Sequence, residues 1–68
     1  MEVDNMKKIN DFTWEYKGCY IFKDLCGNYV AKVLVNNLKL PMTICGATQK
    51  SFKDNFNRLV EENGGLVK

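Results

Sequence analysis

The sequence contains no histidine, one proline and one arginine among its 68 residues. Without histidine the chain lacks the commonest general base near neutral pH, and it lacks the usual Ser-His and Cys-His nucleophile pairs. The acidic residues are scattered along the chain, so no carboxylate pair stands out as an acid and base. The sequence therefore predicts that the protein is not an enzyme.

Cysteine is also sparse, and its spacing excludes two kinds of site. Cys19, Cys26 and Cys45 are odd in number and form no CxxC pair, so neither a disulfide framework nor a structural metal is indicated. No apolar run approaches the ~20 residues that a helix needs to cross a bilayer, and the first residues do not resemble a signal peptide. We expect a cytoplasmic protein with no metal, no cofactor and no membrane association.

The small size limits the chain to one domain, near the lower end of what folds without extra support. Residues 1–10 are polar and aperiodic, so we predict a flexible leader there and a single domain over residues 11–68. Self-association is the simplest source of extra stability, and we therefore expect a homodimer. The net charge of +2 is too small to indicate nucleic-acid binding by itself.

Aromatic residues alternate with polar ones near the start of this domain. Even positions carry the rings: Phe12, Trp14, Tyr16, Tyr20 and Phe22. This period of two predicts one half-buried strand with its aromatic side facing inward. Gly18 is the weak point of the pattern, because a bulge there would reverse the parity of the residues that follow.

Two apolar runs, YVAKVLV and LKLPMTIC, flank the asparagines at positions 36 and 37. Asparagine accepts the positive φ of tight turns, so the spacing predicts a two-residue hairpin. Placing Val35 opposite Leu38 puts Ala31 opposite Met42 and makes one side of the hairpin entirely apolar. A one-residue slip would destroy this sorting, which supports the register.

The segment DLCGN at residues 24–28 predicts an earlier turn, because glycine and asparagine tolerate a left-handed backbone. Pairing Phe22 with Tyr29 across this turn extends one buried face over three antiparallel strands. Pro41 has no N–H to donate, so we expect it on the outer edge of the third strand.

The segment GATQKSFKDNFNRLVEENGG, residues 46–65, predicts an amphipathic helix. Thr48 is the expected N-cap, with Ser51 as a competing start, and the two glycines at 64–65 end the helix. This helix must cover the aromatic side of the sheet, giving an α+β fold of βββα order. Its apolar face is formed by Phe52, Phe56, Leu59 and Val60.

The lengths of these elements predict a dimer contact. A first strand of about 11 residues reaches roughly 36 Å, whereas a helix of about 14 residues reaches roughly 21 Å. The strand would extend beyond its cover. We therefore predict that Phe12 and Trp14, at the uncovered end, contact a second copy.

Three lysines, Lys17, Lys32 and Lys39, gather on the outer face of the sheet in this register. They are either a patch that binds phosphates or an acidic partner, or a solvated face that discourages sheet stacking. Base-edge recognition favours arginine, of which the chain has only Arg58, so the solvated face is the favoured interpretation.

Three stretches resemble the HicB-like antitoxin domain: YKGCYI from Tyr16, GNYVAKV from Gly27 and CGATQKSFKDNFNRLVEE from Cys45. The resemblance implies a truncated RNase H-like fold that dimerises and covers the RNA-binding surface of a small basic toxin. The partner would then be a protein. The match is carried by Tyr16, Lys17, Gly18, Lys32, Val33, Gly46, Thr48, Phe56 and Val60.

The alternative is a DNA-binding module similar to integrase arm-type domains, which place three antiparallel strands before one helix and lay the sheet in the major groove. The exposed sheet face would then act through Lys17, Lys32 and Lys39. We predict a small non-enzymatic binding module, with a protein partner first and DNA as the alternative.

Overall fold

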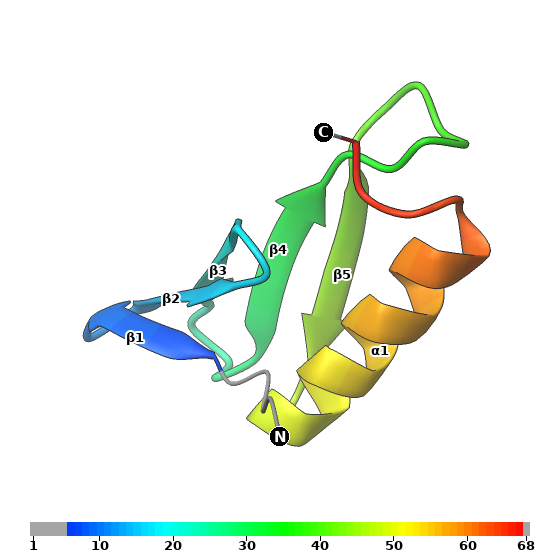
Figure 1. Ribbon diagram of the computed structural model, residues 1–68. Helices are drawn as coiled ribbons and strands as arrows, with labels where there is room; N and C mark the ends of the chain where they lie inside the picture. The colour runs from blue at the N-terminus through cyan, green and yellow to red at the C-terminus, as the bar shows by residue number, and fades with distance from the viewer. Residues whose placement is uncertain (1–5, 68) are drawn as a thin grey trace, which may run out of the picture.

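The computed structural model describes residues 6–67, in which five β-strands precede one α-helix (Figure 1). Strands adjacent in the sequence are adjacent in the sheet, and every pair is antiparallel. The α+β class, the antiparallel sheet and the C-terminal helix agree with the prediction, but the sheet has five strands instead of three. The elements are β1 (Lys7–Asn10), β2 (Thr13–Tyr16), β3 (Cys19–Lys23), β4 (Tyr29–Val33), β5 (Met42–Gly46) and α1 (Gln49–Glu62).

The predicted long first strand is a hairpin, because the chain reverses at Lys17 and Gly18. Both residues have positive φ, 50° and 83°, which is the backbone of a two-residue type I′ turn. Tyr16 pairs with Cys19 across this turn, so β2 and β3 lie side by side. The parity therefore reverses, as the prediction allowed at Gly18, but through a turn and not through a bulge.

A further strand lies inside the segment predicted to be a leader. Lys7–Asn10 form β1, where Lys7 pairs with Glu15 and Lys8 with Trp14. All four β1 side chains are exposed, so the strand has no buried face and leaves no period in the sequence. The predicted leader is thus part of the sheet over Lys7–Asn10, and residues 1–5 lie outside the described residues.

The registers of the two later strand pairs differ from the prediction in different ways. Ala31 pairs with Ile44, two residues from the predicted partner, and an even shift leaves the same side chains facing the core. Phe22 pairs with Val30 and not with Tyr29, and this shift of one reverses the face. Tyr29 is therefore buried while Phe22 is exposed.

The two asparagines form the predicted tight turn, in which the Leu38 N–H donates to the Val35 carbonyl at 3.3 Å. Neither has the expected positive φ, and the strands do not pair directly beside the turn. A loop over residues 34–41 joins β4 to β5, and the Asn36 N–H donates to the Gly65 carbonyl at 3.0 Å. The Asn37 N–H donates to the Asn63 carbonyl at 2.9 Å. Through these hydrogen bonds the two asparagines fix residues 63–65, which follow the helix, against the loop. Pro41 directly precedes β5, which is an outer strand of the sheet, and does not lie within the strand as predicted.

The helix begins and ends as predicted. Thr48 is the N-cap, and its hydroxyl oxygen accepts a hydrogen bond from the Ser51 N–H at 3.1 Å. Asn63 is the C-cap, and Gly64 and Gly65 follow with φ of 88° and 85°. No helix within residues 6–67 has the length and hydropathy needed to cross a membrane.

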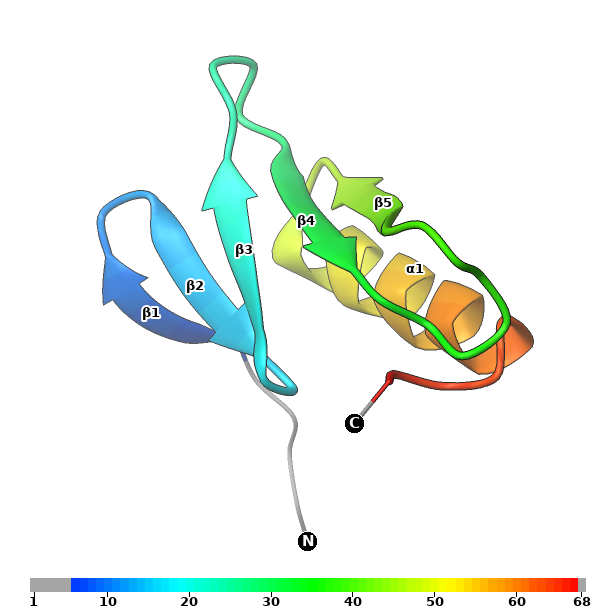
Figure 2. The ribbon, with the colours of Figure 1, turned by 90° about the horizontal axis from the view of Figure 1, so that it is seen from above.

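The core lies between α1 and one face of the sheet (Figure 2). Phe52 and Phe56 of the helix are fully buried, and Leu59 and Val60 are partly buried against the same cluster. The prediction that the helix covers an aromatic face is therefore confirmed for three of the strand aromatics, Trp14, Tyr16 and Tyr29. It is wrong for the other three, Phe12, Tyr20 and Phe22, which are exposed.

Candidate binding groove

Strands β3 and β4 separate soon after they meet. Their ladder contains only two residue pairs, Phe22 with Val30 and Lys23 with Tyr29, although β4 continues to Val33. Figure 2 shows the two strands close together near the turn at residues 24–28 and apart at their other ends. The space between them, which we call the fork groove, has a volume of about 670 Å³. That volume falls in the range of roughly 300–1,000 Å³ typical of ligand sites.

The backbone of β4 shows why the fork groove is open to hydrogen bonding. In an antiparallel strand, alternate residues direct their N–H and C=O groups to the same edge. Val30 faces Phe22 of β3, and the Leu34 carbonyl accepts a hydrogen bond from the Val67 N–H at 3.0 Å. Lys32 lies between Val30 and Leu34 on this edge, beyond the end of the β3–β4 ladder. Its backbone N–H and C=O therefore face the fork groove.

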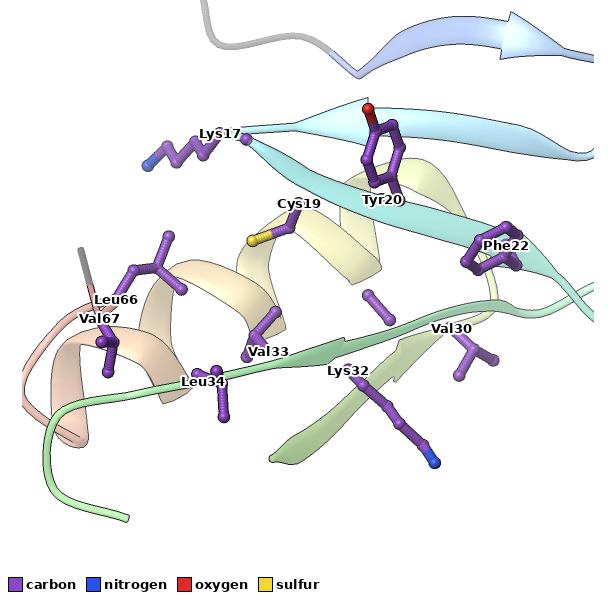
Figure 3. A pocket seen from close by; sticks show the side chains of 12 residues that line it. Lys17, Cys19, Tyr20, Phe22, Val30, Lys32, Val33, Leu34, Leu66 and Val67 are labelled. Carbon is purple, nitrogen blue, oxygen red and sulfur yellow. The ribbon is translucent and has the colours of Figure 1, made fainter. Parts of the chain in front are cut away.

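The rim of the fork groove is apolar and exposed. Four large side chains from β3, the residue after β4 and the C-terminal segment are half or more exposed there: Tyr20, Phe22, Leu34 and Val67. Further in, Cys19 and Leu66 are half-buried and pack against the core. In Figure 3, with α1 behind the strands, these two side chains point toward one another at the open end.

The tip of the β2–β3 hairpin is fastened to the helix. The Tyr16 hydroxyl donates to Asn57 Oδ1 at 3.1 Å, and Lys17 Nζ donates to the same oxygen at 2.9 Å. The Tyr16 ring also meets Phe56 edge-on, with centroids 5.0 Å apart. These contacts fix the position of β3 at the open end of the fork groove.

The structure divides the three lysines of the predicted patch. Lys17 and Lys32 both line the fork groove, and the Lys32 side chain extends away from β3 in Figure 3. Lys39 lies in the 34–41 loop and is not among the lining residues. Lys17 occupies a turn and reaches the helix through Asn57, so the three lysines do not share one sheet face as the predicted register required.

The structure also separates the two residues predicted to contact a second copy. Trp14 is only 7% exposed and meets Tyr29 edge-on, with ring centroids 5.1 Å apart. Phe12 is 68% exposed in the turn between β1 and β2. The predicted long strand is instead a hairpin, so it has no overhanging end, and Trp14 is covered within its own chain.

The chemistry of the fork groove is suited to binding. Burial raises the pKa of the Cys19 thiol, which keeps it protonated near neutral pH and lowers its reactivity. None of the described lining residues is a carboxylate. No group of three or more His, Cys, Asp or Glu within residues 6–67 is placed to hold a metal ion. The groove offers apolar contacts, lysine charge and unpaired backbone groups.

Sequence reasoning assigned Tyr20 and Phe22 to the core, placed Leu34 on the outer sheet face with the lysines and gave Val67 no role. This rim could have been predicted by interpreting Lys17-Gly18 as a hairpin turn, because a turn there directs Tyr20 and Phe22 outward. Comparison with models of known protein families, with curated proteins and with solved structures finds no match for this chain.

Proposed function

We propose that the protein is a non-enzymatic binding module that recognises another protein through the fork groove. The observation that carries this proposal is the exposed apolar rim formed by Tyr20, Phe22, Leu34 and Val67 around open β4 backbone. Contiguous apolar surface of this kind marks interaction sites in soluble domains. Its aromatic content is typical of the central part of protein interfaces.

A protein partner fits the fork groove better than duplex DNA does. The charged side chains among the lining residues are Lys17 and Lys32, and neither is an arginine, the residue that most often reads bases. The third lysine of the DNA alternative, Lys39, lies outside the groove. The basic surface is therefore small beside the apolar rim.

The resemblance to HicB-like antitoxins extends this proposal to neutralisation of a toxin by a dimer. Tyr16, Lys17 and Gly18 carry much of that resemblance, and they form the hairpin tip at the open end of the fork groove. Phe12 is the exposed candidate for the dimer contact. Because the groove carries lysines, a basic toxin would have to present an acidic segment to it.

The test is titration calorimetry with a partner identified by co-purification of the neighbouring gene product. Phe22→Ser removes an exposed rim ring and should weaken the complex at least tenfold, as truncation of a central interface residue does. Leu25→Ser is the matched control, because Leu25 is fully exposed in the 24–28 turn outside the groove. It should leave the affinity unchanged.

Equal losses of affinity for Phe22→Ser and Leu25→Ser would contradict the proposal that the partner binds in the fork groove. Binding to duplex DNA with a steep salt dependence, abolished by Lys32→Glu, would replace the protein-binding proposal with the DNA alternative.

A further inference from the structure

We infer that the fork groove takes an extended acidic segment of the partner protein as an added strand paired with Lys32 of β4. This inference rests on the proposed function and adds the class of segment that is recognised. Addition of an extended peptide to an open strand edge is a recurring mode of protein recognition, in which backbone hydrogen bonds supply affinity and alternate side chains supply specificity.

The first support is that the same edge of β4 already accepts an extended segment. Just beyond the fork, Val35 and Leu66 form an antiparallel bridge, and the Val67 N–H donates to the Leu34 carbonyl at 3.0 Å. Val30 is paired on the other side of Lys32. On this edge of β4, Lys32 therefore has no strand partner among the described residues, whereas Val30 and Leu34 on either side of it are hydrogen-bonded or paired. The Lys32 N–H and C=O already point in the direction that strand pairing requires.

The second support is the arrangement of side chains around this unpaired step. Successive side chains of a strand point to opposite faces. One face of an added segment would meet the exposed rings of Tyr20 and Phe22, and the other would meet half-buried Cys19 and Leu66. The fork groove thus favours a segment with apolar side chains on both faces near its centre.

The third support is charge, and it determines the sign of the partner. Lys32 is exposed on β4 beside this backbone step, and the described lining contains no carboxylate. Opposite charge across an interface steers association, and like charge excludes wrong partners. A segment with acidic residues beside its apolar ones fits, and a basic segment is repelled.

A second copy of this chain is a poor occupant, because neither outer strand of the sheet is suited to the groove. The β1 edge carries Lys7 and Lys8, which would face the groove lysines. On β5, the Cys45 carbonyl already accepts a hydrogen bond from Asn55 Nδ2 at 2.9 Å. The outer strands of a second copy therefore do not suit the groove, and a segment of another protein is the occupant we infer.

The first experiment needs no ligand. Hydrogen exchange followed by NMR on the free protein should find the Lys32 amide exchanging about 100-fold faster than the amides of Ala31 and Val33, because only paired amides are protected. Ala31 and Val33 alternate with Lys32 and face β5, where the ladder is continuous. Equal protection of Lys32 would overturn the strand-addition inference and leave the binding-module proposal standing.

The second experiment uses as the probe a blocked valine–glutamate peptide, with consecutive valines at its centre and glutamates on either side of them. Its binding should slow exchange of the Lys32 amide at least tenfold, whereas a valine–lysine peptide should not bind. A valine–glutamate peptide with N-methyl groups on alternate residues should bind at least tenfold more weakly, because it cannot complete the backbone ladder. Failure of the valine–glutamate peptide to bind, or equal binding by all three peptides, would overturn the inference.

Variants then separate this inference from the proposed function. Lys32→Glu should weaken binding of the valine–glutamate peptide at least tenfold. Lys39→Glu, which changes a lysine outside the groove, should leave this binding unchanged. Equal effects of the two variants would overturn the role of groove charge. If the protein partner itself is insensitive to Phe22→Ser, the proposed function fails independently of these peptide results.

Discussion

The two halves of this sheet differ in how they are supported. Strands β4 and β5 share a ladder of five residue pairs, and α1 packs directly on them. Strands β1, β2 and β3 form successive hairpins, and the side chains of β1 are all exposed. Between the halves the β3–β4 ladder has two pairs. The candidate binding surface thus lies where the fewest residues pair between adjacent strands, and the helix-covered half serves as its scaffold.

The halves share one hydrophobic core, and specific contacts link them. Besides the short ladder, Trp14 packs on Tyr29, and Tyr16 packs on Phe56. Such contacts can hold the two halves at a fixed angle while leaving the groove between them open. Substitutions can therefore weaken or strengthen one half, or the link between them.

The largest expected effect comes from Phe56→Ala. Phe56 is 1% exposed, and its ring contacts Phe52 in the helix and Tyr16 in the hairpin half. Truncating a buried phenylalanine should lower the free energy of unfolding by about 3–5 kcal/mol in a denaturant titration. Phe12→Ala is the control, and removal of this exposed ring should change stability by less than about 0.5 kcal/mol. Similar losses for both variants would contradict the assignment of the core.

Gly46→Ala acts on the helix-covered half alone. A Cβ at Gly46 would lie 2.5 Å from the Phe52 nitrogen and 2.7 Å from its Cα, and backbone atoms cannot move aside cheaply. We expect a loss of about 1–3 kcal/mol, the usual cost of overpacking, measured by denaturant titration. Cys45→Ala, at the exposed neighbouring position, should be nearly neutral. A neutral Gly46→Ala would show that α1 does not approach β5 this closely.

The same contrast explains how much of the fold the sequence predicted. The helix depends on local signals, and Thr48, the apolar spacing and Gly64 placed it correctly. The hairpin at residues 17–18 was missed because Lys17 adopts a φ of 50°, which is uncommon for a residue other than glycine. Once that turn is missed, Tyr20 is assigned to the wrong face.

The fork groove could not be predicted from the pattern for a further reason. It depends on where β3 and β4 stop pairing and on the segment after the helix returning to β4 through Asn36 and Leu66. These contacts join residues about thirty positions apart, and neither propensity nor hydrophobic period records them. Of the predicted site residues, Lys17 and Lys32 come together, whereas Trp14 is part of the core.

A smaller effect should come from Tyr16→Phe, which weakens the link between the halves. The variant removes the hydrogen bond from the Tyr16 hydroxyl to Asn57 and keeps the ring that packs on Phe56. The expected loss is about 0.5–1.5 kcal/mol, and it should fall toward the lower end because Lys17 binds the same Asn57 oxygen. Tyr20→Phe, on the exposed rim, is the matched control and should be neutral in the same titration. An equal loss of stability in the control would contradict a stabilising role for the Tyr16–Asn57 hydrogen bond.

The smallest effect, and the sharpest test of the comparison, is Gln49→Glu. The first turn of α1 contains no acidic residue, so a carboxylate there should interact favourably with the helix dipole and stabilise the protein by about 0.3–1 kcal/mol at low salt. Gln49→Lys is the control of opposite sign, and high salt should shrink the difference between the two. Trp14, the single tryptophan, reports on the hairpin half, while circular dichroism reports on the helix. If the links hold the halves together as one cooperative unit, the fluorescence midpoint must rise with the helical midpoint, and a fluorescence midpoint that stays fixed would show that the two halves unfold separately.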